Sequence, residues 1–184
     1  VIILFDLEKE LYILGFGLAS YGVLQLVAAA FVKNEKSNGL TEILTDLRLM
    51  PKTMGQLAIV QFFTWLALFS MWIYATAAIT SHVYGTSDTT SLAYNNGADW
   101  VGVLFGVYNG AAALFAFLLP VLAKRTSRKI THSIALVAGG LGLCSIILIK
   151  DPNLLIIPFV GIGLAWGSIL SMPYAILTGS IPQT

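Results

Sequence analysis

Five stretches of at least 20 residues contain no Asp, Glu, Lys or Arg, and they cover residues 11–32, 54–81, 100–123, 130–149 and 154–177. About 20 helical residues cross a hydrocarbon layer of roughly 30 Å. A helix also satisfies its own backbone hydrogen bonds, which lipid cannot do. We therefore expect an all-α fold, a polytopic membrane helical bundle. A content of 57% hydrophobic and 10% charged residues argues against a soluble domain.

The basic residues indicate the orientation of these spans. Eight of the ten lie in two connections, at residues 33–53 and 124–129, whereas residues 82–99 contain no Lys or Arg. Because cytoplasmic connections retain Lys and Arg, those two connections are expected on the cytoplasmic side. The chain would then enter from outside and end inside, in a plasma membrane or a bacterial inner membrane. The net charge of +1 gives no indication of nucleic-acid binding.

Three regions are expected along the chain. Residues 1–32 hold the end of an outer loop and a first span, residues 33–53 a cytoplasmic loop, and residues 54–184 four further spans. Within the loop, Leu40, Ile43, Leu44 and Leu47 recur at helical spacing, which predicts an amphipathic helix at the membrane surface. The chain starts at Val1 without Met, and we expect it to be a piece of a longer protein.

Small residues predict where spans pack closely. Gly102, Gly106 and Gly110 repeat every four residues in the third span, and Gly163 and Gly167 do so in the fifth.

Two further features concern helix ends and breaks. Asp99 is expected to cap the third span at its N-terminus. Pro158 and Pro173 are expected to interrupt the fifth span, which favours either a transport pathway or a packing kink.

The chain lacks the usual enzyme signatures. It has no Gly-rich phosphate loop, no Cys and His ligand cluster and no carboxylate inside a span, so we expect neither an enzyme nor a bound cofactor. His82 and His132 lie at opposite span ends and are expected to be interfacial residues rather than proton relays.

Neutral polar and aromatic side chains concentrate in the second, third and fifth spans. Gln61, Trp65, Trp72 and Thr76 have the spacing of one helix face. Amides and hydroxyls beside aromatic rings suit a neutral polyol, because its hydroxyls find hydrogen bonds and its apolar face stacks on a ring. Hydrogen bonding between helices explains any single residue equally well. The candidate substrate-binding residues are Gln61, Trp65, Tyr108, Asn109 and Tyr174.

The order of these features resembles helices six to ten of a major facilitator superfamily transporter. Within that superfamily, three runs resemble the sucrose/proton symporter and glycoside carrier branch, namely VQFFTW at 60–65, HVYG at 82–85 and MPYA at 172–175. The basic connection departs from the family pattern, with Lys124 in place of an acid and Ser127 in place of Gly.

The resemblance implies a twelve-helix major facilitator fold in which residues 54–184 are the first four spans of the C-terminal bundle. It implies symport of a disaccharide or glycoside by alternating access, driven by a proton gradient. The expected partners are a small-molecule sugar, the lipid bilayer and a missing N-terminal helical bundle, which would supply the acidic coupling residue. A membrane-embedded enzyme and a non-transporting sensor on a carrier scaffold are the alternatives.

Overall fold

The computed structural model describes residues 11–33 and 39–179, without the side chains of residues 11, 14, 28–33, 39–41 and 44. In this range every regular element is a helix, which confirms the all-α prediction. The expectations for residues 1–10 and 34–38, and for the side chains of Leu40 and Leu44, lie outside the described residues.

The chain forms two compact units, residues 1–52 and 53–184. In the first unit, α1 (Leu11–Lys33) coincides with the first expected span. α2 (Gly39–Arg48) follows as the expected short amphipathic helix, with Glu42 in its first turn and Arg48 in its last. Opposite charges at these two ends match the helix dipole and stabilise a helix this short.

The second unit contains four long helices, α3 (Lys52–His82), α4 (Leu92–Arg125), α5 (Arg128–Ser145) and α6 (Ile156–Thr178). Two single turns of 3-10 helix, η1 (Ile146–Leu148) and η2 (Pro152–Leu155), connect α5 to α6. Within the described residues, four helices are long and apolar enough to cross a membrane, namely α3, α4, α5 with η1, and η2 with α6. These four coincide with the second to fifth expected spans.

α4 begins eight residues before the expected third span. Ser91 is its N-cap, and the Ser91 hydroxyl accepts a hydrogen bond from the Tyr94 amide at 3.1 Å. Asp99 lies inside the helix and is exposed, so the prediction that Asp99 caps the span was wrong. The 34 residues of α4 extend about 51 Å at 1.5 Å per residue, well beyond a hydrocarbon layer of about 30 Å. The polar first turns therefore need no burial in lipid.

α6 is a continuous helix, so the expected interruption of the fifth span was also wrong. Pro158 lies in the first turn of α6. Backbone nitrogens in the first turn have no acceptor inside the helix, so a proline there costs no helical hydrogen bond. Pro173 lies inside the helix and is buried.

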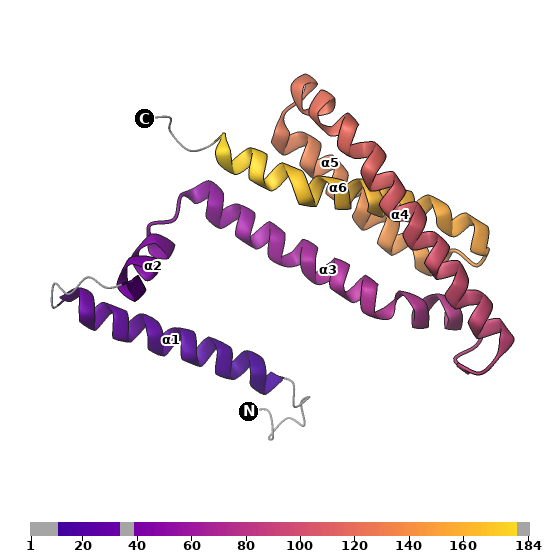
Figure 1. Cartoon of the computed structure of the whole chain (residues 1–184), viewed down its shortest axis with the longest axis horizontal. Coiled ribbons are helices and arrows are strands. Elements are labelled where there is room, and N and C mark those ends of the chain that lie inside the picture. The colour runs from indigo at the N-terminus through magenta and orange to yellow at the C-terminus, as the bar shows by residue number, and fades with distance from the viewer. Residues whose placement is uncertain (1–10, 34–38, 180–184) are drawn as a thin grey trace. The chain divides into compact units, whose positions relative to one another are not determined.

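α6 is the central helix of the second unit and packs against α4 and α5 (Figure 1). A Cβ atom at Gly142 of α5 would lie 2.7 Å from the Pro158 carbonyl oxygen of α6. A Cβ atom at Gly163 of α6 would lie 2.8 Å from the Ala111 Cβ atom of α4. The backbones meet because these positions are glycine, which confirms close packing at the fifth-span glycines.

The glycine stripe of α4 is different. A Cβ atom at Gly102, Gly106 or Gly110 would meet nothing within 4 Å among the described residues. α4 instead turns the face with Tyr108 and Ala111 toward α6. The predicted packing of the stripe therefore has no counterpart in the described part of the chain.

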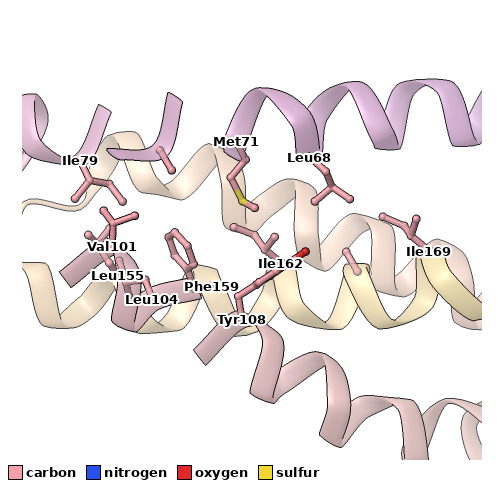
Figure 2. Packing of buried hydrophobic residues seen from close by; sticks show 12 residues of the cluster. Leu68, Met71, Ile79, Val101, Leu104, Tyr108, Leu155, Phe159, Ile162 and Ile169 are labelled. Atoms are coloured by element: carbon pink, nitrogen blue, oxygen red, sulfur yellow. The ribbon is translucent and has the colours of Figure 1, made fainter. Parts of the chain in front are cut away.

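α3 is held to the other helices by side chains. Leu68, Met71 and Ile79 point from α3 toward a layer that includes Phe159 and Ile162 of α6 (Figure 2). Leu104 of α4 and Leu155 of η2 are fully buried in the same cluster. A second cluster near the opposite end joins α4 and α6 through Leu119, Met172 and Ile176, with Leu57 of α3 packed against it.

Candidate functional site

The candidate site is a cluster of aromatic side chains from α3, α4 and α6. Trp65 and Trp72 are seven residues apart on α3, which places them on one face of the helix. Their ring centroids are 6.2 Å apart, and the planes meet edge to face at 78°. Both indoles are partly exposed and pack against the buried core. These two indoles therefore form the part of the aromatic cluster that α3 contributes.

Trp166 of α6 lies at the centre of this cluster. Its ring centroid is 5.7 Å from that of Trp65 and 5.5 Å from that of Trp72, with interplanar angles of 86° and 89°. Tyr108 of α4 stacks on the same indole, with a centroid distance of 6.1 Å and an angle of 25°. These separations are typical of favourable aromatic pairs. One indole thus connects three helices, near the middle of α4 and α6.

Tyr108 is almost completely buried, with 2% of its surface exposed. Among the described residues its hydroxyl has no hydrogen-bond partner of normal geometry, and the Trp72 indole is the polar group beside it. Because Gly163 lets the α4 backbone approach α6 at this level, the position of Tyr108 is set by contacts between backbones. An unpaired buried hydroxyl is costly, which makes Tyr108 a candidate for contact with a polar ligand.

The structure places the five expected site residues differently. Trp65 and Tyr108 come together through Trp166. Gln61 is partly buried on α3, and its side-chain oxygen lies 3.4 Å from the Thr64 hydroxyl. Asn109 is exposed and donates to the Phe105 carbonyl of its own helix at 2.8 Å.

Tyr174 is 67% exposed, near the end of α6 that meets the basic connection. Neither Asn109 nor Tyr174 takes part in the ring contacts of the cluster.

Trp72 and Trp166 belong to the cluster but were not among the expected site residues. Trp72 could have been predicted from the sequence, because it follows Trp65 by about two helical turns and so shares its helix face. For Trp166 the signal was its position three residues after Gly163, on the face of α6 that meets other helices. On α6, though not on α4, the glycines mark the packed face. Trp166 is the large aromatic residue that follows them on that face.

A cavity of about 170 Å³ lies beside the aromatic cluster, between α3, α5 and α6. Thr64 supplies its one hydroxyl group, and the remaining lining is apolar: Phe63, Ala67, Leu68, Leu136, Gly139, Gly140, Leu143, Ile162, Ala165 and Ile169. A sugar would lose hydrogen bonds with water there without replacement. The apolar cavity is therefore not the binding surface for a polar substrate.

His132 lies at the start of α5 as expected, but its side chain is not at the surface. Only 5% of it is exposed, and its Nδ1 atom lies 2.8 Å from the fully buried Ser168 hydroxyl of α6. The prediction of an interfacial residue was therefore wrong for His132, because the α5–α6 contact covers the ring. Among the described residues, no three His, Cys, Asp or Glu side chains come together to hold a metal ion.

Comparison of the chain with protein-family models, with curated proteins and with solved structures finds no match. What the described residues establish is an all-helical fold whose four long apolar helices suit a membrane bundle, with an aromatic cluster joining three of them.

Proposed function

We propose that this protein is a transmembrane sugar transporter of the major facilitator type, which moves a disaccharide or glycoside by alternating access in symport with protons. The single observation that carries the proposal is the aromatic cluster of Trp65, Trp72, Tyr108 and Trp166. Sugar sites combine ring faces with a few polar groups. The Tyr108 hydroxyl of this cluster has no hydrogen-bond partner among the described residues, and Gln61 precedes Trp65 by about one helical turn on α3.

The way α3 is attached also supports alternating access. A carrier must change the distance between helices around its substrate. α3 is joined to α6 by side chains, whereas α5 and α6 touch along their backbones. Aromatic side chains can shift against one another with less loss of packing than two helix backbones in direct contact. α3 is therefore the helix of this unit best suited to move.

Uptake of labelled disaccharides into vesicles that contain the protein tests this function, with and without a pH gradient. We expect saturable uptake that the gradient accelerates, and we expect Trp65→Ala to lower it about tenfold through loss of a stacking partner. Trp100→Phe is the matched control, because Trp100 lies outside the cluster and donates its indole N–H to the Pro152 carbonyl at 2.8 Å. Absence of disaccharide flux would exclude the proposed disaccharide carrier and favour the sensor or the enzyme.

A further inference from the structure

The apolar cavity between α3, α5 and α6 takes no part in the proposed sugar site, and its own chemistry indicates what it can hold. Its volume is about 170 Å³, and the Thr64 hydroxyl is the one polar group of its lining. That hydroxyl donates to the Gln61 carbonyl, about one turn earlier on α3, at 3.1 Å. A cavity of about 150 Å³ with an apolar lining stays dry and binds benzene, so there is room here for a hydrocarbon segment of about six carbons.

The lining comes from the middle of three apolar helices. It lies between residues 63 and 68 of α3, 136 and 143 of α5, and 162 and 169 of α6. Part of its rim is exposed, at Phe63 and Gly140. When these helices cross a membrane, the medium around this rim is therefore lipid hydrocarbon and not water.

A hydrocarbon chain suits this cavity better than water does. A buried water needs several polar partners, and the Thr64 hydroxyl already donates within α3. An acyl chain that enters instead gains dispersion contacts with the apolar side chains of the lining. Of the components of a bilayer, the acyl chain of a lipid is thus the one that matches the lining.

A cation lies on the same face of α5, nearer to the basic connection at 124–129. Lys129 precedes Leu136 by seven residues and Leu143 by fourteen, which places the three side chains on one face of the helix. Leu136 is about 10 Å and Leu143 about 21 Å from Lys129 along the helix axis. Half of a hydrocarbon layer is about 15 Å thick. An acyl chain whose headgroup lies at Lys129 therefore ends at the depth of the cavity.

The charges near Lys129 favour an anionic headgroup. Lys129 is exposed and has no hydrogen-bond or ion-pair partner among the described residues. The neighbouring Arg128 guanidinium donates to a backbone carbonyl near the end of α6. Residues 100–150 and 152–184 contain no Asp or Glu, so α5, α6 and the adjoining part of α4 offer Lys129 no carboxylate. Basic residues at a membrane surface attract anionic lipids.

We propose that Lys129 and the cavity form a binding site for one anionic phospholipid, with its phosphate at the Lys129 ammonium and the end of one acyl chain between α3, α5 and α6. The cavity accepts the chain of any bilayer lipid, so the preference for an anionic lipid comes from the charge at Lys129. The inference rests on the membrane placement of these helices and does not depend on sugar transport.

Photochemical labelling tests the proposal on the purified chain in phosphatidylcholine nanodiscs. The probe is phosphatidylglycerol with a diazirine at the end of one acyl chain, compared with phosphatidylcholine that carries the same group at the same mole fraction. Mass spectrometry locates the labelled peptides. We expect labels at residues 63–68 and 136–143, with about fivefold more from phosphatidylglycerol. Labels spread evenly over the exposed faces of α3 to α6 would overturn the site, and equal labelling by the two lipids would overturn its preference for an anionic lipid.

Two glycine variants test the cavity. Gly140→Leu places a side chain at the rim of the cavity without disturbing the packing, since a Cβ atom there meets no atom of the described residues within 4 Å. Labelling of residues 136–143 should fall to the level of the exposed face of α4. Gly106→Leu is the matched control, because a Cβ atom there also meets no described atom within 4 Å; this variant should keep the labelling. Labelling that persists in Gly140→Leu contradicts the proposal.

Two lysine variants test the headgroup contact, and they keep the proposal testable if Gly140→Leu does not fold. Lys129→Gln should remove the preference for phosphatidylglycerol while both lipids still label residues 136–143. Lys150→Gln is the control, because Lys150 is an exposed cation at the opposite end of α5; it should keep the preference. A preference that survives in Lys129→Gln, or that disappears in both variants, contradicts the assignment of the phosphate to Lys129.

Discussion

α5 and α3 both pack beside α6, but by different means. α5 meets α6 along its backbone, with Gly142 set against the Pro158 carbonyl. α3 meets α6 through indoles such as Trp65 and Trp72, with centroid distances of 5.7 and 5.5 Å to Trp166. Lipid supplies little hydrophobic driving force between helices, so close backbone packing is what fixes a membrane interface. The second unit therefore combines a rigid helix pair, α5 and α6, with a helix, α3, that is attached less rigidly.

Gly163→Leu should give the largest effect, because it attacks the backbone packing directly. The new side chain would collide with the Tyr108 backbone and the Ala111 methyl group. We expect the free energy of unfolding to fall by about 3 kcal/mol, measured by denaturant titration in detergent. Gly106→Ala is the control, since a Cβ atom there meets no atom of the described residues within 4 Å, and the stability of this variant should stay within about 0.5 kcal/mol of the parent. If both variants lost the same free energy of unfolding, close backbone packing at Gly163 would not explain the stability of the unit.

Trp166→Ala should come next, because it removes the ring that connects α3 to α4 and α6. We expect a loss of about 2 kcal/mol, less than for a Trp in a soluble core because lipid solvates apolar groups. The loss should be local. Hydrogen exchange should increase in the middle of α3 while α5 stays protected, and uniform exchange across all helices would show that α3 is not separately attached.

Ser168→Ala should have a smaller effect on the α5–α6 pair. It removes the hydroxyl that lies 2.8 Å from the buried His132 ring, and we expect a loss of about 1 kcal/mol. Ser171→Ala is the matched control, because the Ser171 hydroxyl donates to the Gly167 carbonyl within α6 and should contribute nothing between helices. Thermal unfolding in the same detergent compares the two, and an equal shift would show that the His132–Ser168 bond adds no stability.

Asn109→Ala should leave stability unchanged, since the Asn109 side chain is exposed and its described hydrogen bond goes to the Phe105 carbonyl of its own helix. Under the proposed function, we expect sugar uptake to fall about threefold through loss of one hydrogen bond to substrate. Uptake is measured in vesicles after matching the amount of protein. Unchanged uptake would remove Asn109 from the binding residues and restrict the site to the aromatic cluster.

The positions of the spans could be predicted from the sequence because lipid excludes charge so strongly. Helix ends could not. α4 starts at Leu92 because Ser91 caps it and water solvates its first turns, so the change from polar to apolar residues near Trp100 marks no helix end. Pro158 suggested a break, yet it occupies a first turn that tolerates proline.

The candidate site was predictable only in its residue types. Trp65 and Tyr108 were expected to line one surface, but which ring stands between them depends on how each helix is rotated about its axis. That rotation is set by glycine contacts such as Gly163 against α4. A contact between residues 58 positions apart, like Tyr108 on Trp166, follows from such packing and not from local spacing.

The early start of α4 has a practical consequence for imaging this protein. Its polar first turns, around Tyr94 and Asn95, continue directly into a helix that is locked to α6 at Ala111. An antibody fragment bound to those turns would be connected to the other helices through one continuous helix, α4. Such a fragment would serve as a rigid alignment marker in electron microscopy of a particle that is otherwise hidden in detergent.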